Sequence, residues 1–174
     1  MNLQSLEIVS DRLKLVPISR KYLKDIFANF TSEITTYMFP APPKRKEETE
    51  EFIDSAIRKN ESGEDIVKVI TNKETGEFLG CGGLHKIKSG RPELEIWIKK
   101  SAHGNHYGRE ALTALKDWAD QNINYQYIKY PVDKKNIPSR KIAESLGGEV
   151  IAEMQKTNLS GNILDEVEYR IYKK

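Results

Sequence analysis

The spacing of apolar residues changes along the chain, and this change limits the folds that the chain can adopt. Before residue 60 the apolar side chains recur mostly at helical spacing, whereas between residues 66 and 98 they alternate as in half-buried strands. A second helical pattern follows directly, over residues 107–121. The full order is a strand, two helices, and a meander of three strands, the last of which is also the first strand of a β-α-β-α-β-β series. We therefore expect a single domain over residues 1–174, of the α/β class, with one mixed, mostly antiparallel central sheet and flanking helices.

The periodicity and the cap and turn residues give bounds for each expected element. We expect helices over residues 21–30, 46–59, 107–121 and 138–146, the first capped by Ser19. Strands are expected over residues 13–18, 66–70, 77–85, 92–98 and 127–132, with a closing hairpin of 149–154 and 167–172. Proline and aromatic residues make 37–43 an ordered loop.

Charge and cysteine content exclude several classes of protein. The 28 basic and 26 acidic residues are interspersed along the chain, so the concentrated basic face of a nucleic-acid binder is not expected. The single cysteine, Cys81, excludes an intramolecular disulfide framework and a multi-cysteine metal site. No apolar run approaches the ~18 residues of a membrane span, and no basic start precedes a hydrophobic stretch. We expect a cytoplasmic protein that binds neither membranes nor metal.

The strongest local signal is a glycine-containing loop, residues 100–111, between the third meander strand and the long helix. Such a join presents free backbone N–H groups and the positive end of the helix dipole to an anion, as in pyrophosphate sites. An ordinary strand-to-helix turn is an equal alternative on spacing alone. The loop has neither the Gly-Lys-Ser/Thr of a Walker loop nor the spacing of a dinucleotide fingerprint.

A second signal spans Asn136 to Gly147. Asn136 suits the cap of a short helix, Pro138 suits its first turn, and Gly147 suits its end. Capping alone requires neither Ser139 nor Arg140. Together with the glycine loop, this segment points beyond a purely structural role.

These two segments and their surroundings resemble the GNAT superfamily of acetyl-CoA-dependent N-acetyltransferases, over nearly the whole chain. Residues 11–17 (DRLKLVP), 93–98 (ELEIWI), 108–112 (GREAL) and 136–147 (NIPSRKIAESLG) are similar to successive motifs of its RimJ/RimL-like branch of ribosomal-protein N-terminal acetyltransferases. The resemblance implies the acyl-CoA N-acyltransferase fold. It also implies acetyl-CoA as co-substrate, direct transfer in a ternary complex, and no metal.

The resemblance also implies which residues contact acetyl-CoA. The pyrophosphate loop of the family falls on His103, Gly104, Asn105, His106, Tyr107 and Gly108, where His103 replaces an Arg or Gln and His106 replaces a glycine. Backbone N–H groups near Trp97 and Ile98 are expected to polarise the thioester carbonyl. Further contacts are expected from Arg109, Asn136, Ser139 and Arg140.

Transfer to an amine needs a base, because a substrate ammonium has a pKa of about 10 and only the neutral amine attacks. Glu93 matches the strand glutamate of the family and is the expected base. Glu95, on the same face, is the second catalytic candidate and is expected to attract the cationic substrate as well; a solvated outer face is the structural alternative. Ala143 stands where many members have the tyrosine that protonates the thiolate. Ser145, one of Tyr125, Tyr127 and Tyr130, or water must serve instead.

The resemblance implies a primary amine as acceptor, most specifically a protein N-terminal α-amine. A small-molecule amine and an inactive coenzyme-binding module are the alternatives. The acceptor pocket is expected between the first two helices and the loop over residues 37–43. A homodimer is compatible with the sequence.

Overall fold

The computed structural model describes residues 1–173. One eight-stranded sheet runs through the molecule in the order β1-β2-β3-β4-β5-β6-β8-β7. Its strands are β1 (Ile8–Val9), β2 (Leu13–Pro17), β3 (Ile66–Asn72), β4 (Phe78–His85), β5 (Glu93–Ile98), β6 (Ile128–Asp133), β7 (Glu149–Thr157) and β8 (Ile163–Ile171). Every neighbouring pair is antiparallel except β5 and β6, which are parallel. The expected mixed, mostly antiparallel α/β sheet is confirmed.

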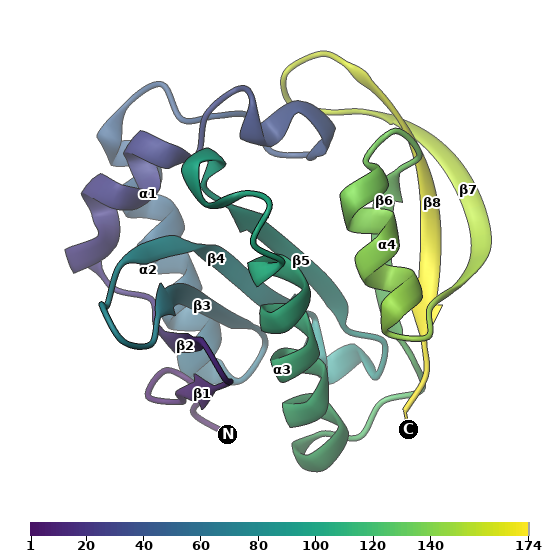
Figure 1. The fold of residues 1–174 in the computed structure, drawn as a ribbon, viewed down its shortest axis with the longest axis horizontal. Helices are drawn as coiled ribbons and strands as arrows, with labels where there is room; N and C mark the ends of the chain where they lie inside the picture. The colour runs from purple at the N-terminus through teal and green to yellow at the C-terminus, as the bar shows by residue number, and fades with distance from the viewer. Residues whose placement is uncertain (174) are drawn as a thin grey trace.

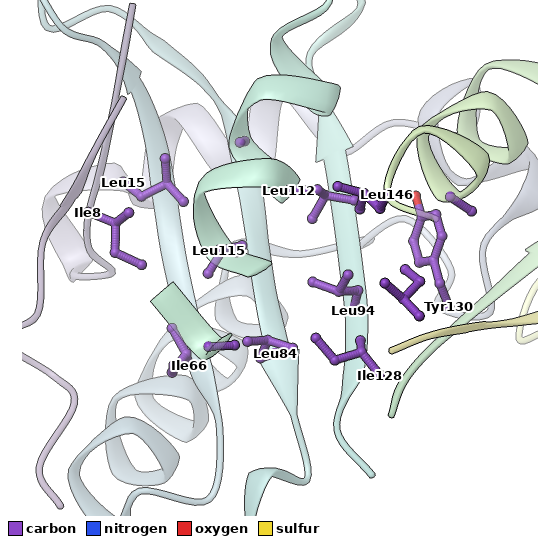
Figure 2. Close-up of a cluster of buried hydrophobic side chains, with 14 of the residues drawn as sticks. Ile8, Leu15, Ile66, Leu84, Leu94, Leu112, Leu115, Ile128, Tyr130 and Leu146 are labelled. Carbon is purple, nitrogen blue, oxygen red and sulfur yellow. The ribbon is translucent and has the colours of Figure 1, made fainter. Parts of the chain in front are cut away.

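Four α-helices pack on the two faces of this sheet (Figure 1). They are α1 (Leu23–Asn29), α2 (Lys46–Ser62), α3 (Tyr107–Asn122) and α4 (Ile137–Ser145). Helices α3 and α4 cover one face over the larger hydrophobic core (Figure 2), and α1 and α2 cover the other over a smaller core. Among the described residues, no helix is both long and apolar enough to cross a membrane.

Strand β5 divides its side chains between the two cores, because successive residues of a strand point to opposite faces. Leu94 and Ile96 contact the core under α3, whereas Trp97 belongs to the core under α1 and α2. Glu93 and Glu95 share the face of Trp97. The sequence pattern predicted this division.

The sheet opens between β5 and β6. The two strands share one aligned pair, Glu93 with Lys129, and the Lys129 N–H donates to the Pro92 carbonyl at 2.8 Å. Beyond this pair β5 continues to Ile98 without a β6 partner in the register. The C-terminal half of β5 therefore borders an opening, and α3 begins just beyond it (Figure 1).

Several expected bounds were wrong. The first helical segment starts as a 3₁₀ turn (Arg20–Tyr22) before α1, and Ser19 makes no side-chain cap hydrogen bond. Helix α2 runs three residues further than expected, to Ser62. Its C-cap is Gly63, whose φ of 69° is left-handed. The closing hairpin is also longer than expected, because β7 is exposed on both faces and so lacks the apolar alternation that marks a strand.

Candidate functional site

The loop before α3 presents a row of free backbone donors. The amides of Ala102 and His103 donate to the carbonyls of Lys99 and Lys100 around a 3₁₀ turn (Lys100–Ala102), and the Glu110 amide donates to the His106 carbonyl. Between them, the six N–H groups of residues 104–109 have no hydrogen-bond acceptor in the described part of the chain. These donors lie at the N-terminus of a 16-residue helix, where the helix dipole adds positive potential. The arrangement suits a phosphate or pyrophosphate group.

The two histidines of this loop differ in role. His106 adopts a left-handed backbone conformation, with φ 61° and ψ 18°, which is unfavourable for a residue with a side chain. A glycine would adopt this conformation without strain. His103 has an ordinary φ of −64°, and its Nε2 lies 2.7 Å from the Ile98 carbonyl oxygen. Its ring therefore holds the last residue of β5. Both side chains are exposed.

Other residues of the loop are held by Arg12, in the turn between β1 and β2. Arg12 donates to the Asn105 carbonyl at 3.0 Å, and its guanidinium lies 4.8 Å from the ring centroid of Tyr107. The Nε of Arg12 also pairs with Glu110 at 2.7 Å. Arg109 is exposed and faces the groove beside β1. These contacts fix the loop while leaving its N–H groups free.

Gly108 lies where α3, α4 and β5 meet. A Cβ atom there would lie 3.3 Å from Ile142 Cδ1 and 3.8 Å from Ile98 Cγ1. The missing side chain thus allows the first turn of α3 to approach both neighbours.

The edge of β5 determines which backbone groups face the opening. Lys99 donates to the Leu79 carbonyl on β4 at 2.7 Å, and Trp97 is aligned with Cys81 of β4. Because donors alternate along a strand, the N–H groups of Ile96 and Ile98 point toward β6 and the opening. The expectation is therefore corrected for Trp97, whose backbone faces β4.

The indole of Trp97 lies in the smaller core. Its ring centroid is 5.0 Å from that of Phe30 and 5.8 Å from that of Phe78. Trp97 therefore forms part of the wall on the α1 side of β5.

The residues expected from the α4 motif hold that helix in place. Asn136 caps α4 by accepting from the Ser139 N–H at 3.3 Å. The Ser139 hydroxyl lies 3.1 Å from that of Tyr130 on β6, and Arg140 Nε donates to the Tyr169 hydroxyl at 3.1 Å. All three side chains thus have structural partners. They position α4 beside the opening.

A cavity of about 200 Å³ lies on the other face of the sheet, against β5. Its walls come from α1, the loop after α1, α2, and the middle of the sheet, which are the elements expected around an acceptor. The lining residues are Ile26, Phe30, Pro40, Ala41, Pro43, Glu48, Thr49, Phe52, Val67, Cys81, Gly82, Gly83, His85, Glu95 and Trp97. Although it lines the cavity, Phe52 is 42% exposed.

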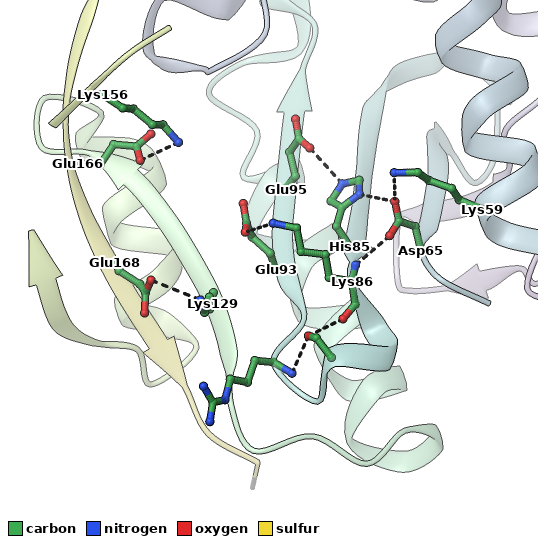
Figure 3. A network of polar contacts seen from close by, with 12 residues as sticks. Lys59, Asp65, His85, Lys86, Glu93, Glu95, Lys129, Lys156, Glu166 and Glu168 are labelled. Carbon is green, nitrogen blue, oxygen red and sulfur yellow. Dashed lines mark hydrogen bonds and ion pairs between the residues drawn. The ribbon is translucent and has the colours of Figure 1, made fainter. Parts of the chain in front are cut away.

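Three charged side chains form a chain of contacts that ends at this cavity (Figure 3). His85 Nδ1 lies 3.0 Å from Asp65 Oδ2, and His85 Nε2 lies 3.0 Å from Glu95 Oε2. Asp65 is 2% exposed and also accepts from the Lys86 N–H at 2.8 Å. Lys59 completes the surroundings of Asp65, with its Nζ 3.3 Å from Oδ2.

The two carboxylates keep His85 charged. Burial disfavours the charged ring, but the hydrogen bonds to Asp65 and Glu95 outweigh it and raise the pKa of His85 to about 9. Burial likewise opposes ionisation of Asp65, but hydrogen bonds from His85 and Lys86 lower its pKa to about 2. At neutral pH an imidazolium therefore bridges two carboxylates.

Glu93 and Glu95 occupy different surroundings although they share one face of β5. Glu95 lines the cavity and contacts His85, and its side chain is 45% exposed. Glu93 is absent from the cavity lining, and its Oε2 lies 3.5 Å from Lys86 Nζ. Position favours Glu95 over Glu93 for chemistry at the cavity.

Of the hydroxyls considered for the thiolate, that of Tyr130 is the candidate, because Tyr130 follows Lys129, the residue of β6 that is aligned with β5. It extends from β6 toward α4, and burial raises its pKa to about 12, with a further upward contribution from the Glu95 charge. Tyr125 donates to Asp120, and Ser145 donates to the Ile142 carbonyl at 2.7 Å. Tyr127 packs against Tyr172, with ring centroids 6.1 Å apart.

Sequence reasoning missed Asp65, His85 and Thr49. His85 is one of only three histidines in the chain and ends a glycine-rich strand, which was the available signal. Burial raises the pKa of the Cys81 thiol well above its usual range, so the thiol is unreactive. Among residues 1–173 no cluster of side chains suits a metal ion.

Comparison with known sequences gives a family match. The sequence model of the Acetyltransferase (GNAT) domain matches residues 12–149. YkkB of Bacillus subtilis (strain 168), described as uncharacterized, is 25% identical over 156 residues, which cover 87% of this chain and 90% of YkkB. The uncharacterized N-acetyltransferase p20 of Bacillus licheniformis is 27% identical over 126 residues, or 70% of this chain and 71% of p20.

Solved structures share the fold at low identity. The RimL ribosomal L7/L12 α-N-protein acetyltransferase in complex with coenzyme A gives a TM-score of 0.85 at 16% identity, over 96% of this chain and 98% of that one. A putative ribosomal-protein-serine acetyltransferase from Vibrio cholerae gives 0.80 at 18%, over 97% and 98%. The microcin C7 self-immunity acetyltransferase MccE, solved with acetyl-CoA and AMP, gives 0.81 at 16%, over 94% and 93%.

Proposed function

The chain belongs to the GNAT acetyltransferase family, and from this membership we propose that it transfers the acetyl group of acetyl-CoA to a primary amine bound in the cavity beside Glu95. The observation that carries the proposal is the position of β5. One edge of this strand borders the opening to β6, and one of its faces lines the cavity. Both substrates can therefore meet across a single strand.

We assign the pyrophosphate of acetyl-CoA to the loop before α3. The six free N–H groups of residues 104–109 supply hydrogen-bond donors, and the α3 dipole supplies positive potential. On this assignment His103 acts through Ile98 rather than through the phosphates. The missing Gly108 side chain leaves room at the junction with α4. Asn136, Ser139 and Arg140 serve by positioning α4.

The N–H groups of Ile96 and Ile98 are assigned to the thioester carbonyl. They point into the opening and are fixed in place by the pairing of β5 with β4. Donors that are already oriented stabilise the negative charge that develops on a carbonyl oxygen during acyl transfer. Acetyl-CoA supplies the activated acetyl group.

Glu95 is assigned as the base that accepts the ammonium proton, directly or through water. Its carboxyl group contacts the charged His85 ring, borders the cavity, and belongs to the residue next to Ile96. We assign to Glu95 the role of base that was expected for Glu93, because Glu93 faces Lys86 outside the cavity lining. His85 and Asp65 are positioning residues that hold the Glu95 carboxylate.

Tyr130 is assigned to the departing thiolate. Its raised pKa keeps the phenol protonated at neutral pH, and its hydroxyl contacts Ser139 at the edge of the opening. A protonated hydroxyl can donate to a developing thiolate. Tyr130 lies on strand β6. The tyrosine that many family members use lies on the helix, at the position that Ala143 occupies here.

A protein N-terminal α-amine is the first candidate acceptor. Two of the structural relatives are described as ribosomal-protein acetyltransferases, and the sequence motifs resemble the same branch. A small-molecule amine is the second candidate, because the cavity is compact and mostly apolar. An N-terminal residue and a small amine both present one ammonium group on a short substituent.

Thiol release from acetyl-CoA with a panel of amines tests the function. The panel contains short peptides with free N-termini, acetylated peptides that keep a lysine, polyamines and amino-acid amides. We expect release that depends on a free amine, together with an increase in melting temperature on adding acetyl-CoA. A binding module without activity would give the increase but no thiol. Equal stabilisation by NAD or ATP would exclude the acetyl-CoA assignment.

A further inference from the structure

We propose that the cavity receives a compact apolar substituent next to the reacting amine, and that the Thr49 hydroxyl hydrogen-bonds to the bound substrate. This inference rests on the proposed function and names its acceptor class: an amine whose adjacent substituent resembles the side chain of leucine. A peptide N-terminus and a free small amine both offer this chemistry.

The walls of the cavity select for apolar groups. The aromatic rings of Phe30, Phe52 and Trp97 border it. Gly82 and Gly83 of β4 also line the cavity. A Cβ atom at Gly83 would lie 2.3 Å from the Ile66 carbonyl oxygen, so a side chain does not fit at this position. Burying one leucine-sized side chain against such walls contributes enough binding free energy to distinguish an apolar substrate from a polar one.

The size of the cavity excludes large substituents. Its volume is about 200 Å³, whereas pockets for drug-sized ligands usually measure roughly 300–1,000 Å³. A group the size of one aliphatic or small aromatic side chain fits this space.

Thr49 supplies an independent sign of a ligand. It is 3% exposed on α2 and lines the cavity, and its Oγ1 has no hydrogen-bond partner among the described residues. Buried polar groups are nearly always paired, because an unpaired one loses its hydrogen bonds to water without replacement. Rotation about the Thr49 Cα–Cβ bond would turn the hydroxyl toward the cavity, where a substrate carbonyl, amide or hydroxyl group would satisfy it.

One wall of the cavity is hydrogen-bonded to a distant part of the chain. The loop between α1 and α2 reaches the β7–β8 turn (Figure 1), where Leu159 donates to the Phe39 carbonyl at 2.9 Å. Asn158 Nδ2 donates to the Met38 carbonyl at 3.2 Å. The same loop contributes Pro40 and Pro43 to the lining. Because the loop is held to the β7–β8 turn at Met38 and Phe39, just before its lining residues, the cavity keeps its compact shape.

The charges around the cavity orient the amine. Glu48 and Glu95 are its two acidic lining residues, and the positive charge of His85 is offset by Asp65 behind it. Both carboxyl groups attract an ammonium group, and with the amine at Glu95, the proposed base, the apolar substituent is left for the aromatic walls.

Binding is measured with coenzyme A present instead of acetyl-CoA, so the result does not depend on turnover. The probes are leucinamide, serinamide and lysinamide, and two tetrapeptides that begin with Leu or Ser. We expect leucinamide to bind roughly 10- to 100-fold more tightly than serinamide, from burial of its side chain. Equal affinities would overturn the inference. Tighter binding of the Leu tetrapeptide than of leucinamide would identify a peptide N-terminus as the source.

Thr49→Val tests the hydroxyl with little change of shape. Relative to wild type, leucinamide affinity should fall about 5- to 10-fold, the effect of one hydrogen bond, while the melting temperature without ligand rises. Thr49→Ser keeps the hydroxyl and should retain the affinity. Unchanged affinity in Thr49→Val would remove Thr49 from the proposal. Absence of thiol release with every amine would instead contradict the proposed function, which the binding data do not measure.

Discussion

His85 Nε2 lies 3.0 Å from Glu95 Oε2, so the carboxylate that borders the cavity is held by a charged ring. The ring is held in turn by Asp65, which is buried and carries its own hydrogen bond from the Lys86 backbone. A carboxylate on a strand edge would otherwise sample several rotamers. This chain of contacts gives Glu95 one orientation toward the cavity.

His85 should make stability depend on pH. Its folded pKa of about 9 exceeds its ordinary value of 6.5, so its contribution is fully present below about pH 6.5 and is lost as pH rises through 9. The loss in free energy of unfolding should be on the order of 3 kcal/mol. His85→Gln cannot titrate and should show a flatter curve in urea unfolding between pH 6.5 and 9.

His103→Gln is the matched control, because this ring is exposed and contacts only a backbone carbonyl through Nε2. It should keep the wild-type pH dependence. A wild-type slope in His85→Gln would show that the ring is not charged through these contacts.

His106→Gly should stabilise the protein. The left-handed conformation destabilises the folded state by roughly 1–2 kcal/mol for a residue with a side chain, and glycine removes this strain. The greater freedom of glycine in the unfolded chain offsets roughly 0.5–1 kcal/mol of the stabilisation. We expect a net increase in melting temperature of about 1–4 °C. Acetyl-CoA should bind at least as well, because the loop N–H groups remain.

His103→Gly provides the opposite case. His103 has a φ of −64° and its ring bonds to Ile98, so glycine there relieves no strain and loses a contact. Its melting temperature should fall. An increase in this variant, or a decrease in His106→Gly, would contradict the backbone account.

Tyr130→Phe should lower turnover by up to roughly 10²-fold, the lower range for general acid catalysis. The ring still packs, so the folded state should lose only about 1 kcal/mol with the hydrogen bond to Ser139. Steady-state kinetics at saturating acetyl-CoA measure the effect. Tyr125→Phe, whose hydroxyl binds Asp120 away from the opening, should keep wild-type turnover. Equal turnover in the two variants would exclude Tyr130 as the donor.

The order of the elements and the buried faces could be predicted from the sequence, because apolar spacing reports which side of an element is buried. The alternation along β5 separated Leu94 and Ile96 from Trp97 correctly. The extent of β7 could not be predicted, because both of its faces are exposed. Where burial does not constrain side chains, the pattern disappears.

The contacts within the site depend on strand register, which the sequence pattern does not report. The connection between β4 and β5 aligns His85 with Glu93, and Asp65 reaches the ring from the residue before β3. The same register decides that Ile96, and not Trp97, faces the opening. The loop before α3 was easier to identify, since glycine and helix start are adjacent in the sequence. Its binding role stays a prediction.

Turnover of Glu95→Gln beside Glu93→Gln tests the central claim most directly. Glutamine keeps the size and removes the basicity, so kcat of Glu95→Gln at pH 7 should fall by roughly 10²- to 10⁴-fold. The loss should shrink as pH approaches the amine pKa of about 10, where the substrate arrives neutral. Glu93→Gln, at the neighbouring position on the same face, should stay within a few fold of wild type. Near wild-type turnover of a folded Glu95→Gln protein, or equal losses in both variants, would contradict the account.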